Sequence, residues 1–139
     1  GWHKRGHVLR AILEGITFNH KTHVDALKSK FPISEARLTG GGAQSELWSQ
    51  LFADALGIPV VITDAREAGA RGAALCAGVA VGVYPSLPAA ADAATRVLRR
   101  HQPDATRHEQ LQETYATYLQ LVEALDPVWR SMDRLAVRV

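Results

Sequence analysis

The sequence predicts an α/β fold in which helices dominate. Two short segments, 33–39 and 59–63, have the composition of strands, and an amphipathic helix is expected between them at 45–56. Two strands joined by one helix imply a right-handed crossover, which makes the strands parallel. Further helices are predicted in four segments, 6–30, 68–81, 89–100 and 108–125. We therefore expect a short parallel sheet of about two strands, flanked by five helices.

The first predicted helix, 6–30, is indicated by apolar residues that recur at steps of three and four. These residues are Leu9, Ile12, Leu13, Ile16, Val24 and Leu27. The helix is expected to end at Phe31-Pro32, because proline disfavours the α conformation in the residue before it. The following segment, 33–39, then leads as a short strand into a run of glycines.

Three consecutive glycines, Gly40 to Gly42, join this strand to the next helix. Without Cβ atoms they let another molecule approach the main chain closely. The helix behind them begins with N–H groups that have no partner inside the helix and with a partial positive charge. Such an arrangement suits a phosphate or a nucleotide. It is neither a P-loop, because no Gly-Lys-Ser/Thr follows, nor a dinucleotide fingerprint, because Ser45 replaces the third glycine. From spacing alone, a tight turn that binds nothing is an equally good interpretation.

The helix after the glycines carries signals for both of its ends. The hydroxyl of Ser45 is suited to accept from a first-turn N–H as an N-cap. Gly57 is suited to the position just after the last turn, and Pro59 prevents the helix from continuing. The segment 59–63 that follows is continuously apolar, as expected of a strand buried on both faces.

The next helix, 68–81, is dense in alanine and glycine. Asp64 and Glu67 have the spacing of a capping box before it. Small side chains allow a helix to lie close to a sheet or to another helix, so we expect that packing, with Cys76 as a small buried thiol.

The rest of the chain is predicted to be a turn followed by two helices. The turn covers 83–88, and an alanine-rich helix follows over 89–100. The last helix, 108–125, carries an apolar stripe that indicates packing rather than a ligand site.

Composition excludes several classes of function. The chain has 139 residues, which is enough for one domain with one core, and a net charge of only +2, so no nucleic-acid or membrane partner is expected. The single cysteine excludes an internal disulfide and a zinc motif, and the histidine pairs lack a third ligand, so we expect no metal site. The longest apolar run, 73–83, is far shorter than the ~18 residues of a membrane span. These features fit a cytoplasmic protein.

Three motifs resemble those of FGGY-family carbohydrate kinases, nearest to the xylulokinase type. They are Arg10–Phe18 with the pattern R-A-x-x-E-G, the glycine-containing segment Gly40–Val60, and Glu67–Ala74 with the pattern E…GAA. The motif-bearing part covers residues 6–90, and residues 91–139 are expected to be C-terminal helices. The resemblance implies that residues 1–139 are a C-terminal, nucleotide-binding domain fragment with a partial ribonuclease-H/actin-like ATPase fold.

The resemblance also implies site residues. Gly40, Gly41, Gly42 and Ala43 would contact bound ATP. Glu46 stands where glycerol-kinase-like members carry Asn near the adenine; an ionised Glu accepts hydrogen bonds without donating and repels phosphates, so an acid favoured by the helix dipole is an equally good interpretation.

No residue is nominated as catalytic base. The four candidate aspartates all lie in helix or turn contexts that explain them without chemistry; they are Asp25, Asp54, Asp64 and Asp92. The base, the sugar-binding residues and most of the Mg²⁺ contacts are expected in an upstream part.

We therefore expect the parent protein to transfer the γ-phosphate of ATP to a sugar or polyol hydroxyl, with this fragment inactive alone. Two alternatives stay open. One alternative is a stand-alone nucleotide-binding module. The other is a helical structural module that forms a homodimer, since exposed sheet edges recruit partners.

Overall fold

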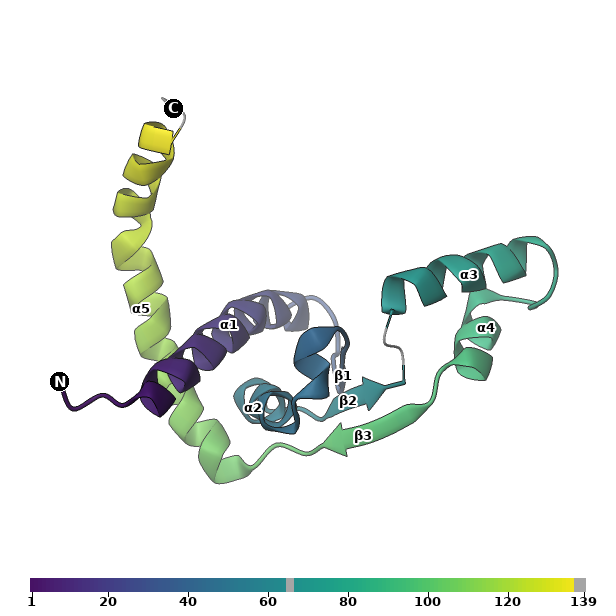
Figure 1. Cartoon of the computed structure of the whole chain (residues 1–139), viewed down its shortest axis with the longest axis horizontal. Coiled ribbons are helices and arrows are strands. Elements are labelled where there is room, and N and C mark those ends of the chain that lie inside the picture. Colours follow the sequence, from purple (N-terminus) through teal and green to yellow (C-terminus); the bar gives the residue numbers. More distant parts are fainter. Residues whose placement is uncertain (65–66, 137–139) are drawn as a thin grey trace.

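The structure, a computed structural model, describes residues 1–64 and 67–136 (Figure 1). Its elements in chain order are α1 (Arg5–Lys28), β1 (Ala36–Leu38), the 3-10 helix η1 (Gly41–Gln44), α2 (Glu46–Leu56), β2 (Val60–Thr63), α3 (Ala68–Ala80), α4 (Leu87–Ala94), β3 (Val97–His101) and α5 (Ala105–Ala136). Figure 1 shows α1, α2 and α5 grouped at one end of the view and α3 with α4 at the other, with the sheet between them. The predicted α/β class with dominant helices is confirmed.

The sheet has three strands in the order β1-β2-β3. β1 and β2 run parallel, with Ala36 opposite Val60, so the predicted parallel pairing is confirmed. β3 runs antiparallel to β2, with Arg99 opposite Ile62. The sheet is therefore mixed rather than parallel throughout.

The third strand corrects the predicted helix over 89–100. The alanine-rich part does form a helix, α4, but that helix ends at Ala94, and residues 97–101 form β3 instead. The backbone N–H of Asp64 donates to the carbonyl of Arg96 (3.0 Å), which begins the pairing with β2. Hydrogen bonds to a distant strand thus override a local helical preference, and the sequence around 97–101 carries no sign of that partner.

The core surrounds β2, as its continuous apolar composition predicted. Val60, Val61 and Ile62 are each at most 4% exposed. One cluster packs this strand against α2 through Phe52, Ala53 and Leu56. A second cluster joins α1, α2 and α5, and it consists of Phe18, Ala55, Leu111 and Tyr115. The helix α2 therefore lies between the sheet and the two longest helices, α1 and α5.

Both predicted ends of α2 are confirmed. Ser45 accepts a hydrogen bond from the backbone N–H of Trp48 (3.2 Å). Gly57 has φ +64°, and a Cβ there would lie 2.6 Å from the ring of His108. Glycine is needed at this position both for the left-handed backbone and for the approach of α5.

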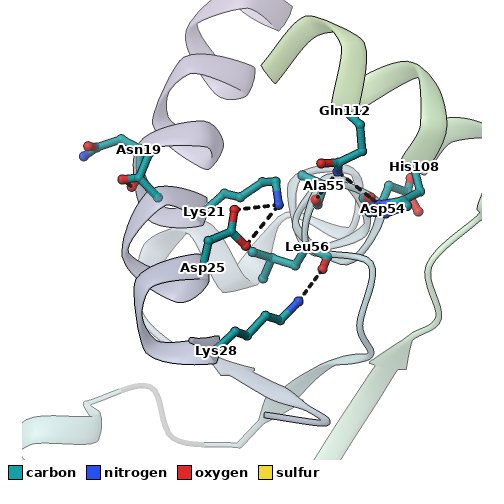
Figure 2. Close-up of polar contacts among 10 residues, drawn as sticks. Asn19, Lys21, Asp25, Lys28, Asp54, Ala55, Leu56, His108 and Gln112 are labelled. Carbon is teal, nitrogen blue, oxygen red and sulfur yellow. Dashed lines mark hydrogen bonds and ion pairs between the residues drawn. The ribbon is translucent and has the colours of Figure 1, made fainter. Parts of the chain in front are cut away.

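Side chains from α1 and α5 satisfy the last carbonyls of α2 (Figure 2). Lys28 donates to the carbonyl of Leu56 (2.9 Å), and Gln112 donates to that of Ala55 (3.1 Å). The Nδ1 of His108 lies 2.7 Å from the carbonyl oxygen of Asp54. The end of one helix therefore fixes the positions of two others.

The region around α3 differs from the expectation in two ways. Its N-cap is Glu67, for which the described residues show no side-chain cap bond, so the predicted capping box is wrong; Asp64 pairs with Arg71 instead. α3 packs against α4 and, over its fully described length, has no buried residue. Cys76 is therefore exposed rather than buried.

The two C-terminal helices have other bounds than predicted. α4 begins at Leu87 inside the expected turn, because Ser86 caps it by accepting from the N–H of Ala89 (3.3 Å). α5 continues past residue 125 with Pro127 inside it. Among the described residues, no helix is long and apolar enough to cross a membrane.

Candidate functional site

The predicted site is the turn of residues 40–44 at the carboxyl end of β1, which we call the glycine turn. Gly40 follows this strand with φ +87° and ψ −167°, a backbone conformation that is essentially confined to glycine. The chain then forms η1 and passes through Ser45 into α2. Gly40 is therefore required by the direction of the chain.

The next two glycines have different surroundings. Gly41 is exposed, and within the described part of the chain no atom lies within 4 Å of the place where a Cβ would stand. At Gly42 a Cβ would lie 3.1 Å and 3.2 Å from ring carbons of Trp48. The bare main chain at Gly42 thus accommodates an aromatic ring of the protein, whereas that at Gly41 faces open space.

Ala43 faces the interior. Its side chain is 6% exposed and belongs to the core cluster around Phe52. A ligand at the turn would therefore meet Ala43 through its main chain alone.

The Trp48 ring that covers Gly42 is held by α1. Its Nε1 donates to the hydroxyl of Thr17 (3.1 Å), and that hydroxyl donates to the carbonyl of Leu13 (2.8 Å). Thr17 lies in the segment Arg10–Phe18 that the sequence singled out. Two motifs that are far apart in the chain thus meet at the glycine turn.

Glu46, the first residue of α2, is paired with an arginine that sequence analysis missed. Its carboxylate accepts from the Nη1 of Arg99 on β3 (2.8 Å), and the Nη2 of the same guanidinium donates to the carbonyl of Ala43 (2.9 Å). Sequence analysis gives Arg99 no role at the site, because it places residue 99 in the helix predicted over 89–100. The position of Arg99 opposite Ile62, beside the turn, follows only from the pairing of β3 with β2.

A second polar cluster lies at the same edge of the sheet. Asp64 follows β2, and since β1 and β2 are parallel, their carboxyl ends meet at one edge. Arg71 of α3 pairs with the carboxylate of Asp64 and also donates to the carbonyl of Ala94 (2.8 Å). The hydrogen bond from Arg71 and that from the backbone N–H of Arg96 hold the pKa of the Asp64 carboxyl below its usual value.

Two of the other candidate aspartates have structural partners. Asp54 is 2% exposed and accepts from Gln50 (2.7 Å) and from the backbone N–H of Asp104 (2.9 Å). Asp25 pairs with Lys21 (2.9 Å). Over residues 1–64 and 67–136, no three His, Cys, Asp or Glu side chains gather as metal ligands would.

Comparisons with known proteins point to one family. Residues 3–81 match the model of the C-terminal domain of the FGGY family of carbohydrate kinases. The matched segment contains α1, the glycine turn, α2, β2 and α3. All three motifs singled out in the sequence therefore lie inside it.

Relatives with similar sequences are also kinases. The chain is 38% identical over 124 residues to the L-xylulose/3-keto-L-gulonate kinase of Escherichia coli, a match that covers 88% of this chain and 25% of that protein. It is 34% identical over 131 residues to the erythritol kinase of Brucella abortus, which covers 93% of this chain and 24% of the relative. The chain thus spans about a quarter of the length of these relatives.

Solved structures show the same fold. The xylulose kinase from Rhodospirillum rubrum superimposes with a TM-score of 0.75 at 27% identity, covering 93% of this chain and 26% of the other. For the xylulose kinase from Lactobacillus acidophilus the TM-score is 0.80 at 24% identity, covering 88% and 25%.

The Asp64 cluster gives a prediction about stability and pH. Because the pKa of Asp64 is lowered in the folded state, its ion pair with Arg71 stabilises the fold above the unfolded pKa of about 3.8 and is lost as the pH falls through the folded value. We expect Asp64→Asn to lower the urea midpoint at neutral pH, and the difference from the unaltered chain to shrink as the pH falls below 3.8. Asp92→Asn, at an exposed position on α4, is the matched control. A difference that stays constant with pH would contradict the assignment.

Proposed function

Because this chain belongs to the FGGY family of carbohydrate kinases, whose C-terminal domain it matches over residues 3–81, we propose that it supplies the nucleotide-contacting wall of a sugar or polyol kinase. The observation that carries the proposal is the open space at Gly41, beside the first turn of α2. A phosphate or a nucleotide fits there, since the bare main chain permits close approach and the helix end favours negative charge.

The proposal assigns a distinct part to each residue of the turn. The main chain of Gly40, Gly41, Gly42 and Ala43 lines the nucleotide, and Gly41 gives the closest approach because the space beside it is open. Glu46 borders the same surface, and its pairing with Arg99 offsets the repulsion that its charge would exert on phosphates.

The chemistry is phosphoryl transfer to an alcohol. Bound ATP supplies the γ-phosphoryl group, and the acceptor is a hydroxyl of a sugar or polyol. Catalysis of this reaction depends on positioning and on stabilisation of charge, for which Mg²⁺ and a group that orients the acceptor are needed. The proposal places most of the Mg²⁺ contacts, the base and the sugar contacts outside this chain; the residues here bind and orient the nucleotide.

Substitution at Gly41 tests the nucleotide site. We expect Gly41→Ala to weaken binding of Mg-ATP about tenfold, or about 1.4 kcal/mol, because the added methyl group occupies the surface on which the nucleotide lies. The measurement is calorimetry on the 139-residue chain at millimolar Mg-ATP.

Gly15→Ala is the matched control, since a Cβ there also meets open space within the described chain but lies on α1. The control should keep the affinity of the unaltered chain. Equal affinities for Gly41→Ala and the control, or no binding of Mg-ATP by the unaltered chain, would contradict the assignment.

The proposal also implies that the isolated chain has no kinase activity. A coupled assay with ATP and L-xylulose, D-xylulose, erythritol or glycerol should give no turnover, because the acceptor and its orienting base are contributed from elsewhere. Turnover that rises with the concentration of purified chain would show that the catalytic groups lie within these 139 residues.

A second candidate function is self-association, which one observation favours. The exposed side of α1 carries an apolar row in which each side chain is 40–55% exposed; it consists of Val8, Leu9, Ile12 and Ile16. Light scattering over a range of concentrations should then show a dimer, and Ile12→Glu should shift it to a monomer. Val81→Glu, at an exposed valine just after α3, should not. A monomer at every concentration would exclude this candidate.

A further inference from the structure

Arg99 makes one hydrogen bond to the glycine turn and one to the first residue of α2. One terminal nitrogen donates to the carboxylate of Glu46 and the other to the carbonyl of Ala43, at 2.8 Å and 2.9 Å. A guanidinium suits this task because its planar fork offers parallel donors in a fixed geometry. One side chain thus connects β3 to η1 and to the first residue of α2 at the same time.

Arg99 is held more firmly by the protein than Glu46, its partner in the ion pair. Arg99 pairs through its backbone with Ile62, which is 4% exposed in the centre of the sheet. The Arg99 side chain is 32% exposed, whereas that of Glu46 is 75% exposed. Arg99 therefore holds Glu46, and Glu46 contributes little to holding Arg99.

Other contacts of the turn leave this role to Arg99. The second donor to the carbonyl of Ala43 is the hydroxyl of Ser49, at 3.4 Å, which is a long hydrogen bond. Trp48 packs against Gly42 and joins the turn to α1 through Thr17, whereas Ser49 belongs to α2. Arg99 links the turn to the sheet.

The ion pair itself contributes little to stability, because exposed pairs are typically worth about 0–1 kcal/mol. Its consequence is geometrical and electrostatic. It presets the main chain of the turn, which removes an ordering cost from ligand binding, and it compensates the Glu46 carboxylate where an anion would approach.

We propose that Arg99 is a positioning residue of this site: through the Ala43 carbonyl and the Glu46 carboxylate, it holds the glycine turn in the conformation that receives the nucleotide. This inference rests on the proposed function for the identity of the ligand. Its structural half, the fixing of the turn, is independent of that function.

Amide hydrogen exchange of the 139-residue chain tests the structural half. Arg99→Ala should speed exchange of the amides of 41–45 at least fivefold, while the amides of β2 stay protected. Arg100→Ala is the matched control: it removes the same charge from the neighbouring position of β3, and its partner is Glu35, away from the turn. Unchanged exchange in Arg99→Ala, or equal changes in both variants, would overturn the proposal.

Binding of Mg-ATP by the same proteins tests the functional half. Arg99→Ala should weaken binding at least fivefold and Arg100→Ala should not. Arg99→Lys should stay weak, because an ammonium restores the charge without the fork. Affinity fully restored by Arg99→Lys would overturn the positioning role.

Glu46→Gln separates geometry from charge. If Arg99 acts by position, the double variant Arg99→Ala/Glu46→Gln still binds Mg-ATP more weakly than Glu46→Gln alone, and this difference persists at high salt. Recovery in the double variant to the level of Glu46→Gln would show that only compensation of charge matters and would overturn the proposal. Absence of nucleotide binding by the unaltered chain would refute the proposed function, and the exchange measurement would still decide whether Arg99 fixes the turn.

Discussion

The last turn of α2 ends inside the protein, where its carbonyl oxygens need partners other than bulk water. Lys28, His108 and Gln112 supply those partners from α1 and α5, at 2.7–3.1 Å. A buried polar group left without a partner costs about 1–3 kcal/mol, so each of these contacts carries more weight than its net energy suggests. Positive charge from Lys28 at the negative end of the helix adds to this. This helix end, together with the apolar cluster that joins α1, α2 and α5, determines how α1 and α5 pack on α2.

With its carboxyl end fixed in this way, α2 has its amino end at the sheet edge. The strand β2 lies directly behind it, with Val61 fully buried, and this leaves α2 little freedom to shift. Asp54 adds a second fixed point, because its buried carboxylate binds the backbone just before α5. The glycine turn is thus attached to one of the most constrained elements of the molecule, which is what a preorganised binding surface requires. The conformation of the glycine turn itself is not determined by α2, and the contact from Arg99 is the one proposed to fix it.

The sequence predicted the elements whose causes are local. Ser45, Gly57 and the apolar run 59–63 determine α2 and β2 through capping, backbone conformation and burial, all of which act within a few residues. The family could likewise be predicted, since its motifs are contiguous. β3 could not, because its cause is the hydrogen bonding of residues 97–101 to a strand more than thirty positions away. Without β3, the role of Arg99 could not be predicted either. The pairing that makes Glu46 compatible with a turn proposed to receive phosphates was therefore also missing from the prediction. The expected burial of Cys76 failed for a related reason: small side chains permit close packing but do not specify a partner.

The three glycines of the turn differ in the physical reason for the absence of a side chain. Gly40 is required by a backbone conformation, Gly42 by the ring of Trp48, and Gly41 by neither, since its φ is not positive and the described protein leaves the adjacent space open. Folding therefore accounts for two of the three. A glycine lowers stability relative to alanine wherever its freedom is not used, by roughly 0.5–1 kcal/mol within regular structure. The unexplained glycine lies beside the start of α2 and at the carboxyl end of the strands, where α/β proteins bind their ligands. The functional interpretation depends on Gly41 because it is the one glycine of the three for which the fold supplies no reason.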